Sequence, residues 1–497
     1  MKSGQLGWDL ARWCGALLLL TLVWGPHWPL SRIGLPSLSH GVLNNGFDLA
    51  DLLLIILLSG WGSALACQTA RPDLRPLWVS VPLVCFTVAS WLAVFSALDP
   101  AAALRFAIRS TGLLLLYLAL RTRSVATNAP LVTPRQATLW LLPGLVLNGL
   151  LALAQYIHQN PLGLVWLYEP QMRLTDSGTA IVLQHGHRVL RAYGVLPHPN
   201  VLGGLVAAAI PMVATLLLIG ARGAEPVVIS TMLAQLFLST STRREGALSP
   251  PSLTLSAQGK MRYGIALCLF LLLLVIASSY SRSAWVGLVG GALFGAMRIW
   301  IADETLRRRW PEMLDRYRRT LRRGAIVVAL LFAGLLFMAW SVGGSRLDLS
   351  ANKLESLSIQ QRFFLQDLTF KVIAWRPLTG VGGNNLVLAE ARFRTLGRGQ
   401  TTGLLPVHNT YLLAAAELGP LGALSWVLLM GAPVIGLRGR GRQELEWWQV
   451  AAGCSLIVVA VVGFFDFYIW VNEPVAVLWV LCLSMSSACS EAGRPVR

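Results

Sequence analysis

Charged residues are scarce in this sequence. Only 13% of its 497 residues are Asp, Glu, Lys or Arg, and 55% are hydrophobic, whereas an average soluble domain is about 25% charged. This shortage excludes a water-soluble globular protein. Paired cysteines are missing as well, because none of the seven cysteines stands in a CxxC motif. The cysteines are therefore interpreted as small hydrophobic side chains.

The chain is instead rich in apolar stretches of about twenty residues, the length that crosses a hydrocarbon layer of ~30 Å. These stretches predict an all-α fold, a polytopic integral membrane protein with about twelve transmembrane helices. The predicted spans are 13–31, 48–68, 78–98, 101–120, 138–158, 199–220, 263–280, 284–301, 325–342, 408–437, 447–466 and 474–490.

The basic linker 302–324, which contains eight arginines, sets the orientation, because short basic loops are retained in the cytoplasm. Counting from it puts both termini in the cytoplasm and two long loops on the outer face. The apolar segment 227–238 is too short to cross, so we expect it in the interface or in a re-entrant hairpin. The predicted units are N-terminal helices (1–158), a first outer loop (159–198), central helices (199–342) with a cytoplasmic insertion (221–262), a second outer loop (343–407) and C-terminal helices (408–497).

The net charge of +18 does not indicate a nucleic-acid partner. Most of the Lys and Arg residues flank predicted spans, where they favour cytoplasmic retention and contact with anionic membrane lipids. Histidine has the opposite distribution, and this topology brings every histidine to the outer face or to the outer end of a span. Because histidine exchanges protons near neutral pH, the chemistry is expected on that face. The histidines are His27, His40, His158, His185, His187, His198 and His408.

A first polar cluster ends the first outer loop and enters the span at 199. Arginines and the free N–H groups of the entering helix could together hold an anion. The alternative is an interfacial cap in which Arg meets lipid head groups. The cluster contains Arg188, Arg191, Tyr193, His198 and Asn200.

Two further sets of arginines lie near outer ends of spans. Arg282, in the short outer turn 278–285, is on the wrong side for cytoplasmic retention; it either binds an anion or reaches the phosphates of the outer leaflet. Arg105 and Arg109 lie one helical turn apart within a span. They could line an anion pocket, or else pair with Asp99 or Glu417.

The second outer loop carries a predicted amphipathic helix with Arg362, on which Phe363, Leu365 and Ile373 are expected to form the apolar face. It is expected to lie on the membrane or to cover a cavity. The glycine-rich turn 380–385 (GVGGNN) could approach a ligand closely, although it lacks the ending of a phosphate loop.

The span after this loop begins with His408 and Asn409, and Glu417 follows about two and a half turns inside it. A histidine at the mouth of a span can act as a general base. The alternative is a histidine that bonds a neighbouring helix end.

Taken in order, these segments resemble the O-antigen ligase and polymerase family of bacterial envelope enzymes. The resemblance covers about residues 190–425, and its order within the membrane plan is more specific than any single motif. The residues that carry it are Arg191, Gly194, Pro199, Asn200, Ser281, Arg282, Arg362, Trp375, Pro377, Gly380, Val381, Gly382, His408, Asn409, Tyr411, Glu417, Gly419 and Gly422.

The resemblance implies a metal-independent glycosyltransferase in the bacterial inner membrane, with its active site facing the periplasm and no cofactor. Attack of the acceptor hydroxyl opposite the leaving group is expected to invert the anomeric configuration. Its donor would be a glycan on undecaprenyl diphosphate, and its acceptor would be lipid A-core for a ligase or a growing glycan for a polymerase. His408, Arg282 and Arg362 would match the catalytic positions. Arg191, Arg282, Arg362 and Arg188 would bind the donor diphosphate, where guanidinium groups stabilise a leaving group of growing negative charge.

Several features depart from this pattern or leave other functions open. Ser283 stands where the family commonly has glycine, and residues 223–262 look inserted. The absence of a long soluble C-terminal domain argues against assignment as a protein O-oligosaccharyltransferase, which is a related enzyme. Outer-face Asp348, Asp367 and Asp466 are scattered, so no divalent-cation motif is predicted. The competing functions are a lipid-linked oligosaccharide flippase or transporter, which would place charges near the bilayer midplane, and a non-enzymatic scaffold.

Overall fold

The computed structural model of the chain describes residues 2–24, 27–29, 46–176, 178–184, 187–219, 255–302, 353–393, 405–436 and 447–486. The predicted span 325–342, the basic linker, the short segment 227–238, His40 and His185 lie outside the described residues.

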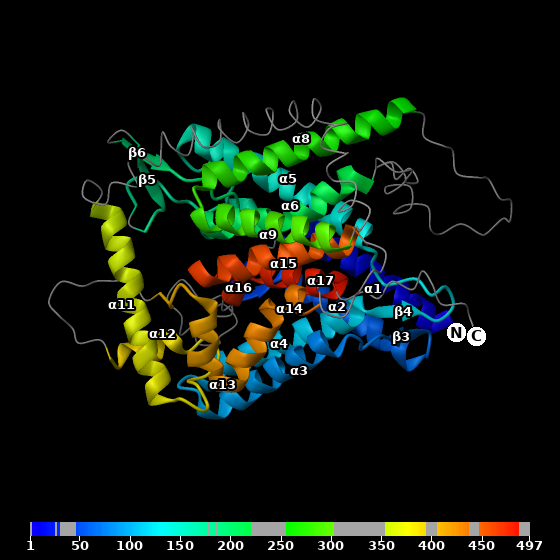
Figure 1. Cartoon of the computed structure of the whole chain (residues 1–497), viewed down its shortest axis with the longest axis horizontal. Helices are drawn as coiled ribbons and strands as arrows, with labels where there is room; N and C mark the ends of the chain where they lie inside the picture. The colour runs from blue at the N-terminus through cyan, green and yellow to red at the C-terminus, as the bar shows by residue number, and fades with distance from the viewer. Residues whose placement is uncertain are drawn as a thin grey trace.

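The described part is mostly helical (Figure 1). Its longer helices are α1 (Lys2–Thr21), α2 (Leu49–Ala66), α3 (Leu77–Leu92), α4 (Pro100–Leu120), α5 (Pro134–His158), α6 (Pro199–Ile219), α8 (Leu255–Ser279), α9 (Arg282–Ala302), α11 (Lys353–Trp375), α13 (Thr410–Met430), α15 (Trp447–Phe465) and α17 (Glu473–Ser486). The short helices are α12 (Leu386–Ala391), α14 (Ala432–Ile435) and α16 (Tyr468–Val471), with single 3₁₀ turns at Ala93–Ser96 and Val165–Leu167. Three two-stranded antiparallel sheets pair β1 (His27–Pro29) with β2 (Gly46–Asp48), β3 (Ala70–Pro72) with β4 (Thr122–Ser124), and β5 (Ile181–Gln184) with β6 (His187–Leu190).

Eight helices in this part of the chain are long and apolar enough to cross a membrane, and the apolar helices Tyr263–Ser279 and Glu473–Ser486 are shorter. The protein is therefore a multi-pass membrane protein, while the count of twelve stays a prediction. The first predicted span, 13–31, was misplaced, because α1 begins at Lys2 and ends at Thr21. Its N-terminal half packs closely on α2, since a Cβ on Gly7 would lie 2.7 Å from the carbonyl oxygen of Gly60.

Polar side chains begin several of these helices. Asp99 accepts hydrogen bonds from the N–H groups of Ala101 and Ala102 at the start of α4, and Thr133 forms a capping box with Gln136 at the start of α5. Each cap satisfies N–H groups that the first turn leaves free. The helix boundaries therefore follow from residues visible in the sequence.

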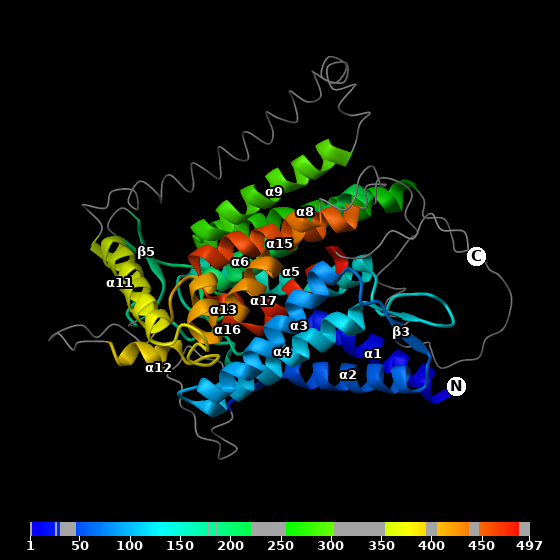
Figure 2. The same cartoon turned by 60° about the horizontal axis from the view of Figure 1, so that its bottom comes forward.

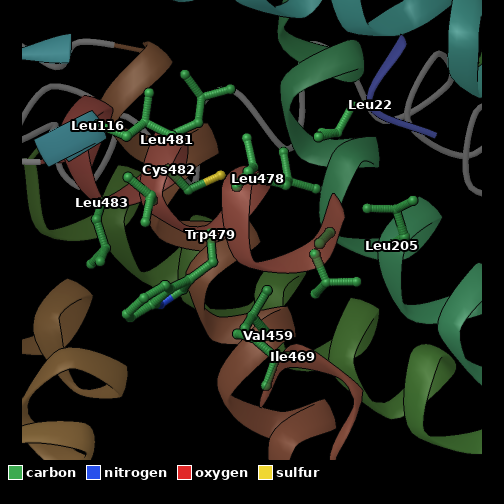
Figure 3. Close-up of a cluster of buried hydrophobic side chains, with 14 of the residues drawn as sticks. Leu22, Leu116, Leu205, Val459, Ile469, Leu478, Trp479, Leu481, Cys482 and Leu483 are labelled. Atoms are coloured by element: carbon green, nitrogen blue, oxygen red, sulfur yellow. The ribbon is translucent and has the colours of Figure 1, made fainter. Parts of the chain in front are cut away.

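The hydrophobic core surrounds α17. Figure 3 shows Trp479 and Cys482 of α17 amid aliphatic side chains, among them Leu22 and Leu205, and these four are at most 2% exposed. A helix buried on all sides is apolar all round, which explains why this segment shows no amphipathic pattern.

Loops that the predicted topology puts on one face do meet in space. The segments 69–77 and 121–137 pair through β3 and β4. At the other end, the N–H group of Leu98 donates to Val381 (3.3 Å) and that of Ala192 donates to Ser278 (3.0 Å). Figures 1 and 2 show β5, α11 and α12 at the end of the bundle opposite β3 and the start of α1. The bundle thus gathers the predicted outer loops at a single end.

Candidate active site

Arg191 is fixed just before α6 by buried hydrogen bonds. Its Nε donates to the carbonyl oxygen of Ser279 at 2.7 Å, and its Nη2 donates to Oδ1 of Asn200. The side chain is only 7% exposed. These bonds tie the first outer loop to the turn between α8 and α9.

Asp466, at the end of α15, completes this network. Nδ2 of Asn200 donates to Oδ2 of Asp466 at 2.8 Å, and the N–H group of Phe467 donates to Oδ1 at 3.0 Å. The carboxylate is 5% exposed. Asn200 therefore bridges a buried carboxylate and the buried guanidinium of Arg191, and buried charges require such partners.

His198 lies beside this bridge. Its Nδ1 accepts a hydrogen bond from the N–H group of Asn200 at 3.1 Å. Burial lowers the pKa of His198 to about 4; Arg191 lowers it too, Asp466 raises it, and His408 and Arg362 lower it further. The imidazole is therefore neutral near neutral pH.

His408 precedes α13 and packs its ring edge-on against Phe467, with the ring centres 5.1 Å apart. Burial lowers the pKa of His408, the Asp466 carboxylate raises it and the Arg362 guanidinium lowers it. Its Nδ1 is buried and has no hydrogen-bond partner among the described residues. A neutral imidazole with an unused ring nitrogen can accept a proton.

Arg362 lies on α11, which packs against α13. Leu365, Leu368 and Val372 form the buried face of this helix. The prediction that Phe363 shares this face is wrong, because Phe363 is 67% exposed; residues two apart lie on opposite sides of a helix. Half-buried Arg362, one turn before Leu365, is close enough to His198 and His408 to lower the pKa of both.

Arg282 is the first residue of α9, and its side chain is exposed. Ser279 and Ser281 beside it are buried, and a Cβ on Gly203 of α6 would lie 2.7 Å from the side chains of both. Arg282 therefore lies three residues after Ser279, whose carbonyl oxygen accepts the hydrogen bond from Arg191.

Three other predicted residues have mainly structural contacts. Asn409 caps α13 by accepting from the N–H groups of Tyr411 and Leu412, and the hydroxyl oxygen of Tyr193 accepts from the N–H group of Ala180 at 2.6 Å. Arg188, in β6, is exposed, and its Nη1 reaches the carbonyl oxygen of Leu174 at 3.5 Å. None of these contacts reaches His408.

Glu417 fastens the glycine-rich turn. Its carboxylate accepts hydrogen bonds from the N–H groups of Asn384 (2.8 Å) and Leu386 (3.1 Å) and from Nε1 of Trp470 (2.8 Å). Gly380 has φ +66°, and a Cβ there would lie 2.3 Å from the carbonyl oxygen of Glu417. Gly380 thus packs closely against α13, and Gly382 and Gly383 pack against Ala97 and Phe106. The approach of this turn to a ligand stays a prediction.

Gly380→Ala is therefore expected to destabilise the protein. A left-handed conformation at a non-glycine residue costs about 1–3 kcal/mol, and the clash with the Glu417 carbonyl adds to this. Unfolding by SDS titration measures the change. Gly62→Ala is the control, because a Cβ at Gly62 meets nothing within 4 Å. Equal stability of the two variants would contradict this account of the turn.

The pairing with Asp99 or Glu417 that was proposed as an alternative is wrong for Arg109. Arg109 pairs with Glu473 through Nη2 and Oε2 at 2.6 Å, while Asp99 caps α4 and Glu417 holds the glycine turn. The acidic partner comes from a helix far along the chain, which no local spacing reveals. Both arginines line a cavity of about 460 Å³.

Five polar side chains therefore form one neighbourhood, here named the Arg–His cluster: Arg191, His198, Arg362, His408 and Asp466. Arg282 adjoins it through the backbone. Asp466 was missed as a site residue; the available signal was a lone acid at an outer span end, in a region otherwise rich in arginine and histidine. Within the described ranges, no group of three or more His, Cys, Asp or Glu side chains could hold a metal ion.

Comparison with known proteins gives one family. Residues 267–427 match the model described as O-antigen ligase, a stretch that begins in α8, ends in α13 and contains Arg282, Arg362 and His408. No curated protein matches the chain. The segment that contains three of the predicted catalytic positions thus matches the O-antigen ligase family, in agreement with the resemblance seen in the sequence.

Proposed function

We propose that this protein moves a glycan from undecaprenyl diphosphate to a sugar hydroxyl on the periplasmic face of the inner membrane, and that it is an O-antigen ligase acting on lipid A-core. The observation that supports this most directly is the Arg–His cluster. Two arginines, a neutral histidine with an unused ring nitrogen, and a buried carboxylate come together from four segments at one end of the bundle.

The proposed reaction is a single displacement. His408 accepts the proton of the acceptor hydroxyl while that oxygen bonds to the anomeric carbon. The bond from this carbon to the diphosphate oxygen breaks, and its electron pair leaves with undecaprenyl diphosphate. Arg362 and Arg282 stabilise the growing charge, as positioned guanidinium groups do in a site shielded from water. Attack opposite the leaving group inverts the anomeric configuration.

Arg191 has a different part in this scheme. Its guanidinium is bonded to Ser279 and Asn200, so it holds the cluster together and contributes positive charge near the diphosphate. Arg188 is exposed at the edge of β6 and would meet the donor only at the rim. Metal independence belongs to the same proposal.

The functional test is reconstitution. Purified protein in liposomes receives an undecaprenyl diphosphate glycan with lipid A-core, or with a second copy of the donor. A glycosylated lipid A-core together with released carrier supports the ligase, and elongated carrier-linked glycan indicates a polymerase. Movement of the donor between leaflets without transfer would instead indicate a flippase. Retained anomeric configuration in the product would refute the single displacement.

The pH dependence tests the role of Asp466. Its carboxylate raises the pKa of His408, so Asp466→Asn should lower that pKa. A base must be neutral to act, and the acid limb of kcat/KM against pH should therefore move to lower pH. Loss of a charged hydrogen bond to Asn200, about 1.5–3 kcal/mol, should also reduce the plateau roughly tenfold or more. Asp367→Asn, on the exposed side of α11, is the control, and an unmoved acid limb in Asp466→Asn would contradict the assignment.

A further inference from the structure

A second site lies against α2, α4 and α17. Figure 2 shows α2 and α4 on the side of the bundle away from α8 and α9, and the central helix α17 packs against α4. The cavity of about 460 Å³ is lined by these helices and by α3, α13 and α16. This volume is within the range of pockets that bind small molecules. None of the Arg–His cluster residues lines it.

The lining changes from charged to apolar in the same direction on three helices. On α2 it passes from Asp51 to Leu58, on α4 from Arg105 and Arg109 to Leu115, and on α17 from Glu473 to Trp479. All three helices begin at the end of the bundle that holds the Arg–His cluster. Asp99, before α4, bonds Asn385 (2.5 Å), and α17 follows Asp466 by seven residues. The helix α2 ends just before β3, which Figure 2 shows at the opposite end. The cavity thus has a charged mouth and an apolar interior, which match the polar head group and the apolar tail of a membrane lipid.

The depth of the cavity corresponds to one leaflet. Ten residues separate Arg105 from Leu115, which is about 15 Å along a helix, and half of a ~30 Å hydrocarbon layer is also about 15 Å. Access from the bilayer is open, because the lining residues Ile55 and Ile108 are 53% and 55% exposed. A long polyprenyl chain would exceed this depth, whereas an acyl chain of one leaflet fits it.

The mouth does not suit a diphosphate. Arg109 is paired with Glu473 at 2.6 Å, and the other charged lining residues, Arg105 and Asp51, are a cation and an anion. Two carboxylates would oppose the concentrated negative charge of a diphosphate, whereas hydroxyl and amide groups of a sugar head can bond both kinds of side chain. The Arg–His cluster, with its excess of cations, is the better diphosphate site.

The inner wall joins the cavity to the proposed active site. Trp470 stacks on Phe106, with ring centres 5.1 Å apart, and its Nε1 bonds Glu417 of α13. His408 lies two residues before the start of α13. A lipid held in the cavity would therefore lie on the other side of one aromatic layer from the segment that presents the base.

We propose that this cavity binds an acyl chain of the glycolipid acceptor. The proposal rests on the proposed function and narrows it, because an acylated acceptor is lipid A-core and not another polyprenyl-linked repeat. The proposal assigns the donor and the acyl chain of the acceptor to opposite sides of the layer formed by Trp470 and Phe106.

Photocrosslinking tests this without any transfer reaction. The full chain in liposomes is mixed with a lipid A glycolipid that carries a diazirine near the end of one acyl chain, in the absence of donor, and labelled peptides are mapped. Labels are expected on the deep halves of α2, α4 and α17. Gly112→Phe fills the cavity beside Leu54 and should reduce labelling by about tenfold, because the new ring takes the space of the acyl chain.

Gly62→Phe is the matched control, since position 62 on α2 faces open space and its labelling should stay at the level of the unmodified protein. Ala476→Phe, which fills the same cavity from α17, replaces Gly112→Phe if that variant does not fold. Equal labelling in filled and control variants, or labels spread evenly over all spans, would overturn the proposal. Displacement by excess undecaprenyl phosphate, but not by unlabelled lipid A, would overturn it in favour of the donor chain. Because labelling needs no catalysis, its failure is distinguishable from a failure of glycan transfer.

Discussion

His408→Ala should lower glycan transfer by about 10²–10⁴-fold, the usual contribution of a general base, and leave binding of the undecaprenyl diphosphate donor nearly unchanged. The imidazole is neutral because burial lowers its pKa, and Asp466 partly offsets this. No other described group in the cluster has an equivalent position, since Nδ1 of His198 is already occupied by the N–H group of Asn200. Initial rates of transfer and a separate donor-binding titration give the two quantities.

His158→Ala provides the comparison for His408, because His158 is exposed at the end of α5 and should not affect either quantity. In the parent protein, the rate should rise with pH through the lowered pKa of His408 and then level off below neutral pH, since the acid form of the base is inactive. Full turnover in His408→Ala, or a rate that rises only above neutral pH, would remove His408 from the role of base.

Much of the membrane plan could be predicted because it depends on local properties. Apolar length predicts the spans, and residues such as Asp99 and Thr133 mark helix starts. The misplaced first span shows the limit of this approach. Residues 2–12 are not continuously apolar, but Gly7 and Ala11 lie against Gly60 of α2. This tertiary contact stabilises the first half of α1, and hydropathy along the sequence does not contain it.

The site could be predicted only in part for a similar reason. His408, Arg362 and Arg191 are conspicuous as single residues because only 13% of the chain is charged. Their connection through Asn200 and Asp466 depends on α6 and α15 lying side by side, 266 residues apart in sequence at the bonded pair. The pairing of Arg109 with Glu473 has the same origin. Long-range polar pairs depend on how the helices pack. The sequence therefore indicates which residues are candidate site residues, but it does not indicate their partners.

The glycine-rich turn has a sequence pattern that fits two different roles. A run such as GVGGNN suits either a ligand or a neighbouring backbone, since both need the space that a side chain would take. Here the neighbours are Glu417 and Leu418 of α13 at Gly380, and Phe106 at Gly383. The turn therefore keeps α13, and with it His408, in register with the second outer loop.

Arg362→Ala is expected to weaken donor binding and to lower kcat by about 10²–10³-fold, as loss of a group that stabilises a developing negative charge does. Arg362 is the member of the cluster carried by α11, and it is close enough to both histidines to lower their pKa values. Arg362→Lys should restore only part of the activity, because lysine keeps the charge and loses the two-pronged contact with phosphate oxygens. The same assay with Arg282→Ala should show a loss in the same direction.

The control on the same helix is Lys371→Ala, which removes an exposed cation paired with Asp367 and should change neither donor affinity nor rate. A purely structural role of Arg362 predicts a different pattern, in which stability falls and the donor affinity of the folded fraction is unchanged. Donor titration on the folded fraction therefore decides between the two. If Arg362→Ala binds the donor as tightly as the parent protein and transfers glycan at the parent rate, the diphosphate must be held elsewhere, and the Arg–His cluster is not the active site.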